Sequence, residues 1–100
     1  MRHAIGGLTR FADDPAAFRT RHYEKHVKDT LVQYMESFEP TSVAGLVDDC
    51  RTGEIIPKTN VGYEDGEFIW STQDIYHLKK YDAAVSDAFI DHVMDVQRQL

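Results

Sequence analysis

The chain has 100 residues and a formal net charge of −6 at pH 7. A chain of this length forms one domain, which excludes a catalytic domain joined to a regulatory one. No stretch is apolar enough to span a membrane, and the first residues lack the apolar core of a signal peptide. A single cysteine, Cys50, leaves no internal disulfide and no cysteine-based zinc site, as is usual in a reducing cytoplasm.

The first expected element is one long amphipathic helix over residues 15–38. Asp14 precedes Pro15, and this pair is typical of a helix start. The apolar residues then recur three or four positions apart, as in one helical stripe. They are Phe18, Tyr23, Val27, Leu31, Tyr34, Met35 and Phe38. Pro40 ends the helix, because the residue before a proline avoids helical backbone angles.

A second, short helix is expected over residues 42–50, with Cys50 as a small buried apolar residue near its end. Residues 61–70 then predict a β-hairpin. Asp65 and Gly66 suit a two-residue type I′ turn, which places Tyr63 opposite Phe68 and Val61 opposite Trp70.

Two helices are expected to complete the chain. Ser71 and Asp74 have the spacing of a capping box, which predicts a helix with Ile75, Leu78 and Tyr81 facing inward. The last helix is expected from about residue 86 to the end. The predicted fold is therefore α+β and mostly helical, with one long N-terminal helix, a central β-hairpin or small antiparallel sheet, and two C-terminal helices in a single domain, residues 1–100.

Acidic residues are concentrated in the second part of the chain. Residues 1–38 hold six basic and five acidic side chains, whereas residues 39–100 hold five basic and twelve acidic ones. Two groups stand out, one on the last predicted helix at four-residue spacing and one at the hairpin tip. They are Asp87, Asp91 and Asp95, preceded by Asp82, and Glu64, Asp65 and Glu67. We interpret the two groups as a partner-binding surface for a basic protein; the other interpretation is an ordinary solvated surface.

A metal site is the alternative for three side chains on the first predicted helix. His22, His26 and Asp29 share one helical face, as ligands of one ion would. Basic neighbours repel a cation, however, and the pattern lacks the glutamate of the zinc-protease motif. We therefore expect a solvated polar face and no metal.

The remaining candidates are aromatic. Trp70, Tyr76 and Tyr81 are expected in the core, with a ligand-binding platform as the alternative. The sequence has no phosphate-binding glycine loop and no nucleophile elbow. We expect no enzyme activity and no cofactor.

Two family resemblances bear on function. Gly53-x-Ile55-Ile56-Pro57, Gly62-Tyr63 and Asp74-Ile75-x-x-Leu78 resemble the wing and following helix of mercury-resistance-type regulators and excisionases. This resemblance implies DNA binding, although acidic residues stand where that wing carries an arginine.

The second resemblance covers about the last forty residues. Asp65-Gly66-x-Phe68-x-Trp70, Ile75-Tyr76, Lys80-Tyr81 and Phe89-Ile90 resemble a set of small, largely uncharacterised bacterial proteins, some of them similar to immunity proteins. It implies a protein that neutralises a toxin.

The sequence hypothesis is a cytoplasmic acidic inhibitor that binds a protein partner, most simply an immunity protein against a basic toxin such as a nuclease. A phage-encoded inhibitor of a host defence complex, acting as a nucleic-acid mimic, is one alternative. A degenerate winged-helix DNA-binding regulator is the other. No membrane partner is expected, and direct nucleic-acid binding is not favoured.

Overall fold

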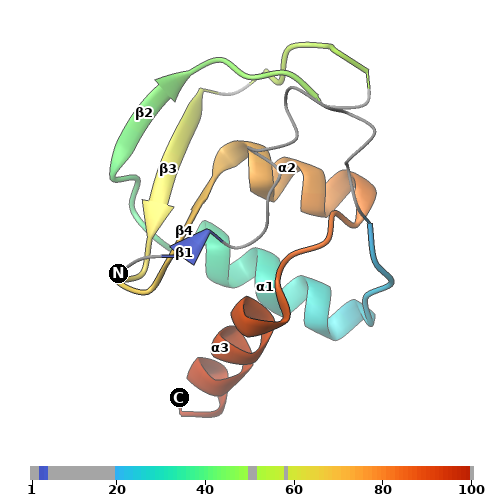
Figure 1. Ribbon diagram of the computed structural model, residues 1–100, viewed down its shortest axis with the longest axis vertical. Helices are drawn as coiled ribbons and strands as arrows, with labels where there is room; N and C mark the ends of the chain where they lie inside the picture. The colour runs from blue at the N-terminus through green and yellow to red at the C-terminus, as the bar shows by residue number, and fades with distance from the viewer. Residues whose placement is uncertain (1–2, 5–19, 50–51, 58, 100) are drawn as a thin grey trace.

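The computed structural model describes residues 3–4, 20–49, 52–57 and 59–99. These residues form an α+β fold with three helices and a sheet in the strand order β1-β4-β3-β2 (Figure 1). The strands β2, β3 and β4 are antiparallel, and the short β1 pairs in parallel with β4. The strands are β1 (His3–Ala4), β2 (Ser42–Gly45), β3 (Asn60–Glu64) and β4 (Phe68–Ser71). The helices are α1 (Lys25–Glu36), α2 (Thr72–Tyr81) and α3 (Asp87–Arg98).

The prediction of a long N-terminal helix is wrong. Helix α1 has 12 residues, and its N-cap Glu24 has an extended backbone, with φ −66° and ψ 143°. The preceding residues pair with a distant segment instead: Thr20 bridges to Ala83, and the Arg21 amide donates to the Asp82 carbonyl at 3.0 Å. This long-range pairing supplies the hydrogen bonds that a further helical turn would supply, so it overrides the local helical pattern. The predicted helix start at residues 14 and 15 lies outside the described residues.

The protein is also less helical than predicted. The three helices hold 12, 10 and 12 residues, fewer than half of those described. The short helix expected over residues 42–50 is absent from the described part of that segment, where Ser42–Gly45 form the strand β2. Val43 pairs with Val61, and the Thr41 amide donates to the Gly62 carbonyl at 2.8 Å. The pairing with β3 therefore makes this segment a strand instead of the expected helix. Cys50 lies outside the described residues.

The hairpin is present, but its register differs from the prediction by two residues. Tyr63 is opposite Trp70 and Glu64 is opposite Ile69. The central turn residues are Gly66 and Glu67, and Gly66 has φ +97°, which an L side chain rarely adopts. Asp65 occupies the position before the turn, where its Oδ1 accepts from the amides of Glu67 at 2.9 Å and Phe68 at 2.7 Å. Because the shift is two residues, each side chain keeps its predicted face.

The core lies between the helices and one face of the sheet. Figure 1 shows the sheet at the left of the view and the helices at its right. Phe68 and Trp70 of β4 are buried, whereas Ile69 between them is exposed. The helices contribute Leu31, Tyr34 and Met35 from α1, Ile75 and Leu78 from α2, and Phe89 and Val93 from α3. The alternation along β4 thus sets which face of the sheet the helices cover.

The two C-terminal helices begin as predicted. The Ser71 and Asp74 side chains form the capping box at the start of α2. Ser86 caps α3 by accepting from the Phe89 amide at 3.2 Å. Helix α2 ends at Tyr81, and the left-handed backbone of the next residue, Asp82 (φ 56°), turns the chain toward α3.

Candidate functional site: an acidic face on α3 and the hairpin tip

The three predicted aspartates of the last helix form one exposed stripe. Asp87, Asp91 and Asp95 are all exposed, on the side of α3 away from buried Phe89 and Val93. Asp87 pairs with Nη1 of Arg21 at 2.7 Å, and Asp95 pairs with Nη2 of Arg98 at 3.0 Å. Within the described residues, Asp91 makes no salt bridge. The stripe thus presents one unpaired carboxylate between two that are paired at the surface.

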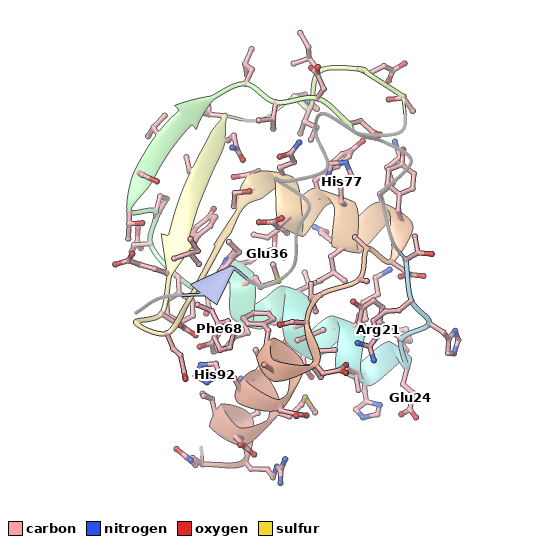
Figure 2. All side chains as sticks on the ribbon, viewed as in Figure 1. Arg21, Glu24, Glu36, Phe68, His77 and His92 are labelled. Carbon is pink, nitrogen blue, oxygen red and sulfur yellow. The ribbon has the colours of Figure 1, made fainter. Side chains whose placement is uncertain are left out.

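The hairpin tip lies beside this helix because His92 of α3 joins them. The Nδ1 of His92 is 3.0 Å from Glu67 Oε2, and its Nε2 is 2.8 Å from Asp65 Oδ2. Figure 2 shows His92 next to Phe68, the first residue of β4, and their rings are 5.0 Å apart. The structure therefore brings Glu67 and Asp65 of the tip beside α3. Glu64 lies opposite Ile69, on the face of the sheet that the helices do not cover.

Asp65 differs from the other predicted partner-binding residues. Its side chain is only 3% exposed, and its Oδ2 accepts from the Tyr34 hydroxyl at 2.5 Å. Burial by itself raises the pKa of the Asp65 carboxyl, but the hydrogen bonds from Tyr34, the Phe68 and Glu67 amides, and His92 together bring it below its ordinary value. Asp65 is thus an ionised structural group that joins α1, the hairpin and α3, and it does not lie on the exposed surface.

The cluster around Asp65 has the residue types of a catalytic site, but its geometry is that of a clamp. Both ring nitrogens of His92 face carboxylate oxygens, so both are already engaged within the cluster and neither is left to contact a substrate. Burial, with the hydrogen bond to Asp65, raises the pKa of the Tyr34 hydroxyl, which keeps it protonated. The cluster therefore holds the tip in place.

Sequence reasoning missed Tyr34 and His92 as partners of Asp65. Tyr34 was expected only as a core residue of a helical stripe, and its ring does lie in the core. The contacts span 31 residues to Tyr34 and 27 to His92, so no local spacing could signal them.

The three residues considered as metal ligands do not come together. Helix α1 begins at Lys25, so His22 is not on the same helix as His26 and Asp29. His26 lies 3.5 Å from a Glu24 carboxylate oxygen, and Asp29 accepts from Lys25 at 3.2 Å. Among the described residues, no group of three or more His, Cys, Asp or Glu side chains is placed to hold a metal ion.

A second polar cluster surrounds Asp49, a residue that the sequence did not single out. Asp49 is 1% exposed, and its Oδ2 accepts from the hydroxyls of Tyr76 at 2.8 Å and Tyr81 at 2.7 Å. Its Oδ1 accepts from the Thr52 amide at 3.1 Å. Tyr76 and Tyr81 thus anchor the loop after β2, while Trp70, with which they were grouped, lies in the main core.

No protein-family model matches the chain, and neither the curated proteins nor the solved structures include one significantly similar to it. In the part of the chain that the structure describes, no helix is both long and apolar enough to cross a membrane.

Proposed function

We propose that this protein is a small acidic inhibitor that binds a basic protein in the cytoplasm, as an immunity protein binds a toxin such as a nuclease. The binding surface, called the acidic face below, comprises Asp87, Asp91, Asp95 and Glu67; Glu64, which was predicted with them, lies on the other face of the sheet. One observation carries the proposal: the aspartates of α3 are exposed at one-turn intervals, and the Glu67–His92 contact holds the acidic hairpin tip beside them.

The ion pairs already present on this surface do not oppose the proposal. The side chains of Asp87 and Asp95 are 84% and 63% exposed, and their arginine partners are also accessible. Exposed pairs of this kind contribute about 0–1 kcal/mol, so a partner's cations can replace them at little cost. The excess of acidic residues in residues 39–100 would steer a basic partner toward the molecule and repel nucleic acid.

Asp65, which is buried beneath the acidic face, holds the hairpin tip in position. Its bonds to Tyr34 and His92 fix the tip relative to α1 and α3, so that Glu67 reaches the binding surface in one conformation. A preorganised surface loses less conformational entropy on binding.

Of the two alternatives, inhibition of a defence complex by mimicry of nucleic acid uses the same acidic face. The identity of the partner distinguishes the two functions: a toxin indicates immunity, and a component of a defence complex indicates mimicry of nucleic acid. The DNA-binding alternative has less support, because residues 42–45, where a recognition helix would precede the wing, form the strand β2.

Affinity capture from native lysate tests the proposal when three forms of the chain are compared. Wild type is compared with two double variants. One is Asp91→Lys/Asp95→Lys on the acidic face, and the other is Glu39→Lys/Glu54→Lys at exposed positions elsewhere. Both variants change the net charge equally, so only the position of the change differs. We expect wild type and the Glu39/Glu54 variant to capture the same basic protein and to inhibit its activity, and the Asp91/Asp95 variant to lose it.

Equal capture of that protein by all three forms, or a partner that is itself acidic, would contradict the proposal. Circular dichroism checks that both variants fold. Lysine has a higher helix propensity than aspartate, so the two substitutions on α3 are compatible with the helix.

A further inference from the structure

A cavity of about 300 Å³ lies against α2, on a part of the molecule separate from the acidic face. Helix α1 lies between α2 and α3 (Figure 1), and no residue of the acidic face lines the cavity. This volume is at the lower end of the range for small-molecule sites, which is about 300–1,000 Å³.

The walls of the cavity are apolar and fixed in place. Ile56 and Pro57 form one wall, and Ile75 and the ring of Tyr76 form another. Ile56 and Ile75 are almost completely buried, at 2% and 7% exposed. The Tyr76 ring is held by its hydroxyl, which donates to Asp49. Such walls suit the apolar body of a small molecule.

Two ammonium groups stand at the rim, although the protein as a whole is acidic. The Nζ of Lys80 donates to the Tyr76 hydroxyl at 3.0 Å and lies 5.4 Å from the centre of its ring. It is 3.6 Å from Asp49, but that carboxylate is buried and already accepts two tyrosine hydroxyls. The Tyr76 hydroxyl and Asp49 therefore position the Lys80 ammonium group, while about half of the side chain stays exposed.

Lys79 has a replaceable partner. Its Nζ is 3.7 Å from Oε2 of Glu36, at the C-terminal end of α1 (Figure 2), and both side chains are about half exposed. An exposed pair at this distance is weak, so a ligand carboxylate can take the place of Glu36 beside Lys79.

We infer that this cavity is a binding site for a small organic carboxylate. Its apolar body lies between Ile56, Pro57, Ile75 and the Tyr76 ring, and its carboxylate pairs with Lys79 and Lys80. Pro57 and the Tyr76 ring supply the accessible apolar surface, with Ile56 and Ile75 packed behind them, and the two ammonium groups select for negative charge. The site is independent of the proposed partner surface, so either can fail without the other.

Three probes that share one body and differ in charge test the site. They are 3-phenylpropanoate, 3-phenylpropan-1-ol and 3-phenylpropan-1-amine, each titrated against protein with labelled isoleucine methyl groups and followed by NMR. We expect saturable shifts at Ile56 and Ile75 with the carboxylate, binding about tenfold weaker with the alcohol, and none with the amine. Equal binding of the carboxylate and the alcohol, shifts confined to other residues, or no binding of the carboxylate would each overturn the inference.

Two variants then move the affinity in opposite directions. Lys79→Gln/Lys80→Gln is expected to weaken carboxylate binding about tenfold or more, whereas Lys25→Gln, an exposed lysine on α1, leaves it unchanged. Glu36→Gln removes the competing carboxylate and is expected to tighten binding, with Glu39→Gln as its control. Unchanged affinity in either the lysine variant or Glu36→Gln would contradict the inference. Where the lysine variant folds poorly, Glu36→Gln alone decides.

Discussion

Two buried aspartates, Asp65 and Asp49, organise two regions of this protein by the same means. Each side chain is nearly inaccessible, at 3% and 1% exposed. Asp65 accepts a hydrogen bond from one tyrosine hydroxyl and Asp49 from two. The difference lies in the basic residue nearby. His92 is enclosed between Asp65 and Glu67, whereas Lys80 stands beside Asp49 at the rim of a cavity.

This difference shows that the composition of a polar cluster does not by itself indicate its role. The Asp65 cluster uses both nitrogens of its histidine internally and thereby fixes the shape of the acidic face. The Asp49 cluster positions an ammonium group that remains accessible. What a group can still contact, rather than which groups surround it, distinguishes a clamp from a binding site.

The largest expected effect concerns the core on which both regions rest. Trp70 is 3% exposed, packs 5.9 Å from the ring of Tyr34, and donates from Nε1 to the Met35 carbonyl at 3.1 Å. Trp70→Ala should therefore lower the free energy of unfolding by about 3–5 kcal/mol. Urea denaturation measures this loss, with Ile69→Ala on the exposed face as the control. A loss no larger than that of the control would show that Trp70 does not belong to the buried core.

The next largest effect distinguishes the role of Asp65 from that of Asp49. Asp65→Asn should lower the free energy of unfolding by about 1.5–3 kcal/mol, the usual contribution of hydrogen bonds to a charged group. NMR should show shifts at the hairpin tip and α3. Asp49→Asn should instead affect the loop after β2 and leave the tip unchanged. If both variants perturb the same residues, the two clusters are not independent.

The effect of Asp65 should also depend on pH. Its pKa is lower in the folded protein than its ordinary value of 3.8. Its charge therefore stabilises the fold fully above that ordinary value, and the stabilisation is lost as the pH falls through the lower pKa of the folded state. The difference between wild type and Asp65→Asn should thus diminish in acid.

Asp74 should show the opposite pH dependence. Complete burial raises the pKa of Asp74 to about 7, although the amide and hydroxyl of Ser71 donate to it. The unfolded chain loses this proton near pH 4 and the folded protein only near 7, so stability falls as the pH rises between these values. Relative to Asp74→Asn, wild type should lose at least about 1 kcal/mol over this range. Thermal unfolding at pH 4, 5.5 and 7.5 measures it, and a rise in relative stability would contradict the assignment.

The elements that were predicted correctly carry local signals. The capping box of Ser71 and Asp74 marks α2, and the alternation of Phe68, Ile69 and Trp70 marks a half-buried strand. The exposure of Asp87, Asp91 and Asp95 follows from helical spacing alone. The use of these residues as a partner surface stays a prediction.

The elements that were predicted wrongly depend on distant residues. Helix α1 is shorter than expected because residues 20–23 pair with residues 82–85, sixty or more positions away. Strand β2 forms because β3 pairs with it. The hairpin register moved because the Asp65 side chain accepts from the turn amides, and the two buried aspartate clusters join segments far apart in the sequence.

The rate of association with the captured basic protein tests the acidic face most directly. Stopped-flow measurements at several salt concentrations should give a wild-type rate that falls as salt rises, because exposed charges are screened over about 10 Å at 0.1 M. At low salt, Asp91→Lys/Asp95→Lys should slow association by a factor of about 10 to 1,000. Glu39→Lys/Glu54→Lys, with the same net charge, should stay close to wild type. An Asp91/Asp95 variant that associates at the wild-type rate at every salt concentration would contradict the account.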